Sequence, residues 1–140
     1  MGMRPVDFSY PHPEFDMLAM REGPYDRRAL DSLERTGGVA LMAKVIDQFL
    51  EKVPLRMDDA CDRGRAGDLN GLGRAVQYIG TAAGNVGATE ISDMAGRINK
   101  LAEAGAKDIV LPLLCQLDDM LGHAKSWLQK EKSTFGYRAG

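Results

Sequence analysis

Few side chains in this sequence are of the types that carry out chemistry, and they lie far apart along the chain. The 140 residues include two histidines, His12 and His123, and two cysteines, Cys61 and Cys115. A metal site needs several such ligands at a defined spacing, and no His–Glu or Cys–His pair has that spacing here. We therefore expect solvent-facing histidines, reduced thiols, no metal and no cofactor.

Two pairs of neighbouring carboxylates, Asp58–Asp59 and Asp118–Asp119, have the residue type needed for general acid–base chemistry. Both pairs fall on segments with helical periodicity, where charged residues usually form the solvated face. The glycine-containing runs GLG (71–73) and GTAAG (80–84) do not follow a strand, as a phosphate-binding loop would. We therefore interpret the aspartates as surface charges and the glycine runs as parts of a helix.

One helical segment near the middle of the chain is rich in glycine. It runs from residue 69 into the stretch RAVQYIGTAAGNVGA, residues 74–88. Its four glycines are Gly71, Gly73, Gly80 and Gly84. Each glycine inside a helix costs about 1 kcal/mol relative to alanine, which is a large cost beside the ~5–15 kcal/mol that holds a typical domain folded. The glycines therefore indicate that something approaches the backbone of this helix closely.

The residues that share a helix face with Gln77 are mostly small. They lie three, four or seven positions from it and are Gly73, Arg74, Gly80, Thr81 and Gly84. We interpret this face as a partner-binding surface on which one amide and one arginine stand among small residues. Close packing against another helix is the alternative explanation for the glycines, and their outward phase argues against it for Gly80 and Gly84.

Apolar residues at steps of three and four predict the helices that precede this face. A short leading helix over residues 27–36 would be capped by Asp26 and stopped by Gly37–Gly38. A long apolar stripe follows over residues 41–61, and Pro54 within it predicts a kink. The first half of the chain is therefore expected to form a short helix and then a long, bent one.

Two further helices are predicted around the glycine-rich segment. Asp68 would cap the helix that begins at residue 69, and GNVG at residues 84–87 would form the turn after it. The next apolar stripe covers residues 91–102 and ends at Gly105. The short connections predict that neighbouring helices run antiparallel.

Asp108 is expected to cap the last helix, with Pro112 tolerated near its first turn. Because no segment has a convincing strand pattern, we predict an all-α fold, an antiparallel up-down four-helix bundle with a short leading helix. The bundle would span residues 26–131. A proline-rich N-terminal arm (1–25) would precede it, and a flexible tail (132–140) would follow.

The composition narrows the class of partner. With 18 basic and 20 acidic residues, the formal charge of −2 leaves no concentrated basic surface for a nucleic acid. The first residues lack the apolar core of a signal peptide, and no run reaches the ~18 apolar residues of a membrane span. We therefore expect a cytoplasmic protein that binds neither nucleic acid nor membrane.

With the helix order and the motif in view, the sequence resembles the histidine-containing phosphotransfer (HPt) family of multistep phosphorelays. That family carries H-x-x-K-G, followed by Gly-Ala ten and eleven positions after the histidine. Gly87–Ala88 match the Gly-Ala, which puts Gln77 at the histidine position, Gly80 at the lysine and Thr81 at the glycine. The resemblance covers about residues 26–129 and implies the four-helix bundle predicted above.

The resemblance also implies a docking face for a response-regulator receiver domain or a histidine kinase, centred on Gln77. The family's imidazole attacks an aspartyl phosphate, whereas the amide nitrogen of Gln77 has a delocalised lone pair and forms no useful phosphoramidate. We therefore predict that the protein is not an enzyme but a pseudo-HPt adaptor in two-component signalling. Arg74, one turn before Gln77, would meet the acidic pocket around the receiver's aspartate.

Two alternatives to the adaptor stay open. The first is a true phosphotransfer protein that uses another acceptor, His12 or His123. The second is a helical bundle used for self-association or assembly. The partner's identity, the pathway, the sign of regulation, the oligomeric state and the role of the arm do not follow from the sequence.

Overall fold

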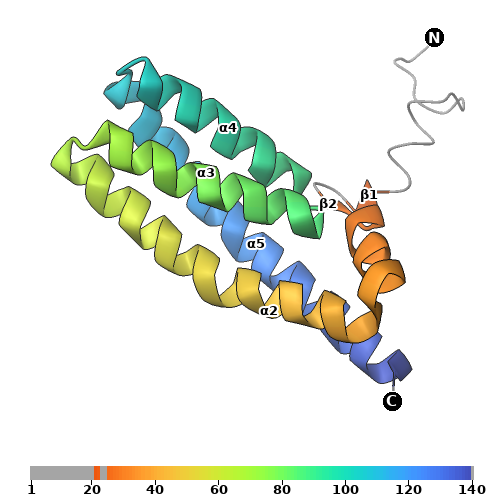
Figure 1. Cartoon of the computed structure of the whole chain (residues 1–140). Helices are drawn as coiled ribbons and strands as arrows, with labels where there is room; N and C mark the ends of the chain where they lie inside the picture. Colours follow the sequence, from red (N-terminus) through yellow and green to blue (C-terminus); the bar gives the residue numbers. More distant parts are fainter. Residues whose placement is uncertain (1–20, 23–24, 140) are drawn as a thin grey trace, which may run out of the picture.

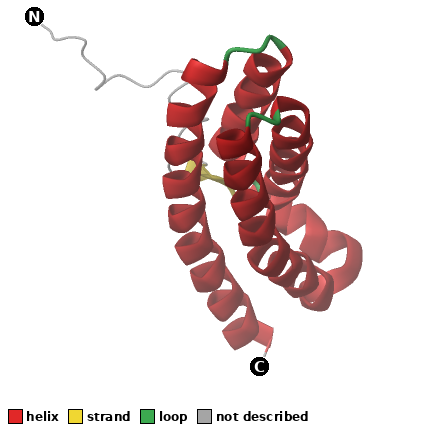
Figure 2. Cartoon of the chain, turned by 90° about the vertical axis from the view of Figure 1, so that its left-hand side faces the viewer, coloured by secondary structure: helices red, strands yellow, loops and turns green. Residues whose placement is uncertain are grey.

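The structure, a computed structural model, describes the backbone of residues 21–22 and 25–139 and the side chains of 25–134. Its elements in chain order are β1 (Arg21–Glu22), β2 (Tyr25–Asp26), α2 (Arg28–Ala66), α3 (Leu69–Val86), α4 (Thr89–Glu103) and α5 (Lys107–Ala139). The helices run side by side, and the α2–α3 and α4–α5 turns lie at the same end (Figure 1, Figure 2). The predicted all-α four-helix bundle is confirmed.

A break divides α2 into a short leading helix and a long bundle helix. Gly38 is the residue within α2 that has non-helical dihedrals, with φ 79° and ψ −177°. Glycine adopts such a left-handed φ at little cost, and the leading segment turns away here across the end of the bundle (Figure 1). The stop predicted at Gly37–Gly38 is therefore confirmed. Pro54 keeps helical dihedrals and α2 continues through it without a break, so the bend expected there stays a prediction.

The start of α3 follows the prediction. Asp68 precedes the helix, and its side chain accepts a hydrogen bond from the backbone N–H of Gly71 at 2.9 Å. The Asp68 carboxylate also pairs with Arg63 of α2 at 2.6 Å. The hydrogen bond from the Gly71 N–H, and next the hydrogen bond from Arg63, lower the pKa of Asp68. The carboxylate therefore stays charged and fixes the direction in which α3 leaves α2.

The other two predicted caps are displaced. α2 begins at Arg28 with Arg27 at the N-cap, so Asp26 lies one position before the cap, but its Oδ1 still accepts the Arg28 backbone N–H at 3.0 Å. Asp108 is not a cap, because α5 begins at Lys107 and Asp108 lies in its first turn. Pro112 is consequently beyond the first turn, although the helix continues through it.

The helix ends also differ in part from the prediction. α3 continues to Val86, so most of the turn expected at 84–87 is helical, and Gly87 with φ 85° ends the helix. Gly105, with φ 75°, lies in the turn after α4 as predicted. α5 continues to Ala139 and includes residues 132–139, which the sequence analysis assigned to the tail.

The segment before α2 is fastened to the bundle. The Asp26 backbone N–H donates to the Gly87 carbonyl at 2.7 Å, which ties the segment to the α3–α4 turn. The Tyr25 ring stacks on Trp127 of α5 with centroids 4.4 Å apart. β1 and β2 pair antiparallel over two residues each, a feature the sequence analysis did not predict. Most of the predicted arm, residues 1–20, lies outside the described residues.

The core lies where the inner faces of the four helices meet. Its largest fully buried side chains include Ile46, Leu72, Ile79, Ile98, Leu117 and Leu128. Burial of a side chain of this size contributes roughly 1.5–3 kcal/mol. Within the described residues, none of the helices has an apolar stretch long enough to cross a bilayer.

Candidate functional site

Gln77 lies on the outer side of α3, at the edge of a groove between α3 and α4. Its side chain is exposed and makes no hydrogen bond with the described part of the chain. Two shallow hollows of about 270 and 200 Å³ meet beside it, and both are also lined by Asn99 of α4. The Gln77 amide is therefore available, as donor and acceptor, to another molecule.

Two of the predicted site glycines face α4 instead of solvent. Gly80 is buried, and a Cβ built on it would lie 3.1 Å from the Ala95 Cβ. Gly73 is also buried, and its Cβ would lie 2.8 Å from Asn99 Oδ1. The predicted outward phase is therefore wrong for Gly73 and Gly80. Their small size allows α3 and α4 to pack closely, which was the alternative explanation.

The open part of the predicted face is smaller than expected. Thr81, Gly84 and Arg74 are exposed with Gln77, so the structure brings these four together on one surface. A Cβ on Gly84 would meet Ser92 Oγ at 3.7 Å, an ordinary contact distance. A larger side chain at Gly84 would therefore be tolerated by the fold and would project from this surface.

The structure adds residues of α2 to the surface, which the sequence analysis missed. The guanidinium of Arg56 lies 4.6 Å from the centre of the Tyr78 ring, a cation–π contact. Tyr78 directly follows Gln77, and an aromatic residue at an outward helical position was the signal available in the sequence. The surface around Gln77 therefore has an aromatic flank, Tyr78, on its α2 side.

Other chemistry-bearing residues lie apart from this surface. His123 is exposed on α5 and lines a hollow of about 160 Å³ with Tyr25 and Glu90. Burial, and next the charge of Asp118, raise the pKa of the Cys61 thiol. Within the described residues, no three His, Cys, Asp or Glu side chains form a group that could hold a metal ion. His12 lies outside the described residues.

Comparisons with known proteins agree with this fold. A family model described as "Hpt domain" matches residues 44–127. No curated protein sequence gives a significant match. The chain is similar to the crystal structure of histidine-containing phosphotransfer protein B (HptB) from Pseudomonas aeruginosa PAO1, with a TM-score of 0.76 and 18% identity. The match covers 80% of this chain and 96% of that chain, and at this identity it shows a shared fold.

Proposed function

Because the chain belongs to the Hpt domain family, we propose that it is a non-catalytic adaptor of two-component signalling. Hpt proteins are phosphotransfer carriers that interact with histidine kinases and response regulators. In this proposal the chain binds a receiver domain or a kinase through the surface around Gln77 and accepts no phosphate. It would act in the cytoplasm, where it would compete with a true phosphotransfer protein or hold its partner in one state.

The observation that carries the proposal is the exposed Gln77 amide, which the spacing to Gly87–Ala88 puts at the position of the family's histidine. A phospho-accepting residue needs a basic lone pair at neutral pH, which imidazole has and an amide lacks. Gln77 offers one N–H donor group and one carbonyl acceptor to a partner without placing a charge in the interface. A neutral residue also avoids the cost of burying an unpaired charge on binding.

The packing of Gly80 supports the same conclusion. The motif spacing puts Gly80 where the family has lysine, and Ala95 of α4 lies 3.1 Å from the position of its missing Cβ. A lysine there would need Ala95 to give way by a few tenths of an ångström. In this proposal the site therefore departs from the catalytic pattern both in its acceptor and in its backbone packing.

The surface around Gln77 has the features of a transient interface. Arg74 provides a positive charge one turn from Gln77, where the acidic pocket of a receiver would lie in this proposal. Tyr78, with Arg56 stacked on it, provides the aromatic flank that protein interfaces favour. Signalling encounters commonly use interfaces of this limited size.

Binding to purified receiver domains, with and without beryllofluoride, tests the adaptor role by calorimetry. Thr81→Arg and Gly84→Arg should each weaken binding by about tenfold or more, since central interface positions dominate affinity. Gln116→Arg, at an exposed position on α5, is the matched control and should bind as wild type does. Binding that is unchanged by both Thr81→Arg and Gly84→Arg would contradict the proposal.

Phosphate transfer is tested with a radiolabelled receiver and a radiolabelled kinase. The wild-type chain should remain unlabelled, because the Gln77 amide is not a nucleophile. Gln77→His should accept label, and Gln77→His combined with Gly80→Lys and Ala95→Gly should accept more, because the last change makes room for lysine. Label on the wild type that is lost in His12→Ala or His123→Ala would identify a true phosphotransfer protein instead.

A further inference from the structure

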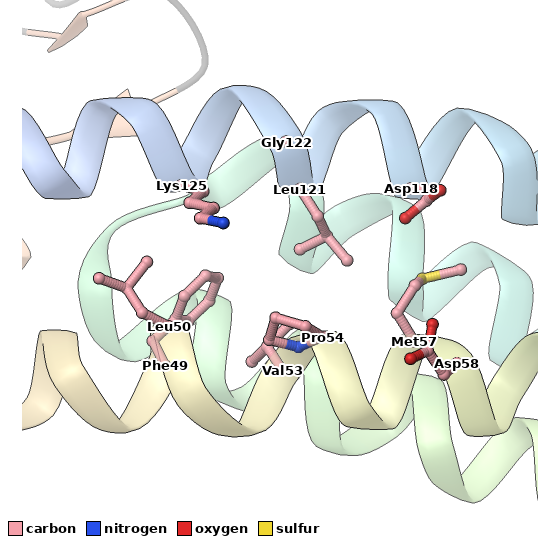
Figure 3. Close-up of a pocket in the computed structure, with 10 residues that line it drawn as sticks. All are labelled: Phe49, Leu50, Val53, Pro54, Met57, Asp58, Asp118, Leu121, Gly122 and Lys125. Atoms are coloured by element: carbon pink, nitrogen blue, oxygen red, sulfur yellow. The ribbon is translucent and has the colours of Figure 1, made fainter.

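A further hollow, apart from those described above, lies between α2 and α5 (Figure 3). Its volume is about 340 Å³. The apolar side chains that line it are Phe49, Leu50, Val53, Pro54, Met57 and Leu121. Apolar surface that lines an open groove gains free energy when another molecule covers it. The groove is therefore a candidate interface that the function proposed above does not use.

The charges at the two ends of the groove have opposite signs. Asp58 of α2 and Asp118 of α5 lie at one end, and Lys125 of α5 lies at the other (Figure 3). None of these three forms an ion pair within the described residues, whereas Lys132, two turns beyond Lys125 on α5, pairs with Asp47 across the same two helices. Two carboxylates thus lack a cation, and one ammonium lacks an anion.

Gly122 lies midway between these charges on α5. Seven residues separate Asp118 from Lys125, which is about 10 Å along a helix. No atom lies within 4 Å of a Cβ built on Gly122, so the middle of the groove rim is open. Figure 3 shows Gly122 on α5 above Pro54, with Lys125 to one side and Asp118 to the other.

We propose that a second copy of this chain covers the groove, with the two-fold axis passing near Gly122. The two α5 helices then run antiparallel, and each copy places its Lys125 opposite Asp58 and Asp118 of the other. This arrangement is self-complementary, as a two-fold interface must be, because the same surface supplies both signs of charge. Gly122 allows the two helix backbones to approach at the crossing point.

The apolar lining has a role in the same arrangement. The methylene stem of the second copy's Lys125 lies over Pro54 and Met57, and its ammonium reaches the two carboxylates. Long basic side chains commonly cover apolar surface in this way while the charged head stays at the rim. Both the hollow and its unpaired charges are thereby accounted for by one occupant.

The proposed interface and the surface around Gln77 use different residues. Gln77 lies beside the groove between α3 and α4, whereas the proposed interface uses α2 and α5. The dimer would therefore present two partner-binding surfaces. Because the interface shares no residue with the Gln77 surface, either proposal can fail without the other.

Sedimentation equilibrium over a wide concentration range, with the purified full chain, tests the dimer. Asp118→Lys and Lys125→Asp should each raise the dimer dissociation constant by about tenfold or more, because each places like charges together. The double variant restores opposite charges between positions 118 and 125 but leaves Asp58 opposite an aspartate, so it should recover part of the lost affinity. A wild type that is monomeric throughout, or a double variant no better than the singles, would overturn the proposal.

Cross-linking tests the position of the two-fold axis independently. Gly122→Cys, with Cys61 and Cys115 both changed to serine, places one thiol per copy at the crossing point. Copper phenanthroline with oxygen removes two protons and two electrons from the paired thiols and should form a disulfide-linked dimer. Gln116→Cys in the same background is the matched control, exposed on α5 but away from the groove. Equal cross-linking of both variants would contradict the proposed geometry.

Discussion

Two of the helix–helix interfaces in this bundle, α3–α4 and α2–α5, are built in opposite ways. Between α3 and α4, Gly80 and Ala95 meet so closely that one added methyl group would lie 3.1 Å from its neighbour. Between α2 and α5, large side chains such as Phe49 and Leu121 leave a hollow of about 340 Å³. Gly73 and Gly80 therefore serve mainly to let α3 and α4 pack closely. The α2–α5 side instead has an open groove with charges of both signs, which is available to another molecule.

The largest effect is expected at the α3–α4 turn, where Gly87→Ala should destabilise the protein by about 2–4 kcal/mol. Its φ is 85°, and an added Cβ would overlap the Asp26 carbonyl oxygen. Gly105→Ala is the matched control, with φ 75° but no atom within 4 Å, and should cost only roughly 1–2 kcal/mol. Urea unfolding measures both, and equal losses would show that the Asp26 contact is unimportant.

The next largest effect is expected where α3 and α4 pack closely. Gly80→Val should destabilise the protein by about 1–3 kcal/mol, because the added carbons overpack the contact with Ala95. Ala95→Gly in the Gly80→Val protein should recover part of this loss by making room. Thermal unfolding compares the single and double variants. No recovery in the double variant would mean that the α3–α4 contact is not the source of the strain.

At glycines outside the α3–α4 contact, substitution by alanine should raise the free energy of unfolding instead of lowering it. Gly96→Ala on α4 and Gly122→Ala on α5 should each stabilise the protein by about 0.5–1 kcal/mol, because alanine loses less backbone entropy in a helix. No atom lies within 4 Å of a Cβ at either position. Urea unfolding in dilute protein, where association does not contribute, measures the change. A loss of stability at either position would contradict the distinction between glycines inside and outside the α3–α4 contact.

The smallest effect concerns the end of the bundle, where Tyr25 packs on α5. Burial, and next the charge of Glu90, raise the pKa of Tyr25 above its usual 10.0. The folded state therefore favours the neutral phenol, so this contribution to stability is complete below pH 10 and declines as the pH rises above it. Glu90→Gln should lower the Tyr25 pKa, measured by ultraviolet difference titration against Tyr25→Phe. An unchanged titration would exclude the Glu90 contribution.

Helix order and some helix ends followed from the sequence because they depend on local signals. Apolar steps of three and four marked the buried faces, and Asp68 and Gly38 marked boundaries through side-chain capping and a left-handed φ. The prediction of Asp108 as the N-cap of the last helix was wrong, because α5 already includes Lys107.

The candidate site was less predictable because each bundle helix touches two neighbours. Periodicity identified the face around Gln77 but not which flank of it a neighbouring helix covers. Gly73 and Gly80 lie on the flank toward α4, whereas Thr81 stays exposed. The contact between Arg56 and Tyr78 joins two helices, and so it depends on tertiary packing that one helix's pattern does not contain.

The hydrogen bond from the Asp26 N–H to the Gly87 carbonyl has a consequence for the order of folding. The four helices are joined by short turns, so neighbouring helices dock through local contacts that form quickly. The Asp26 bond instead closes a long loop, and its acceptor is positioned only after α3 has ended in the left-handed Gly87. The segment before α2 should therefore join last, on an α3–α4 hairpin that is already complete.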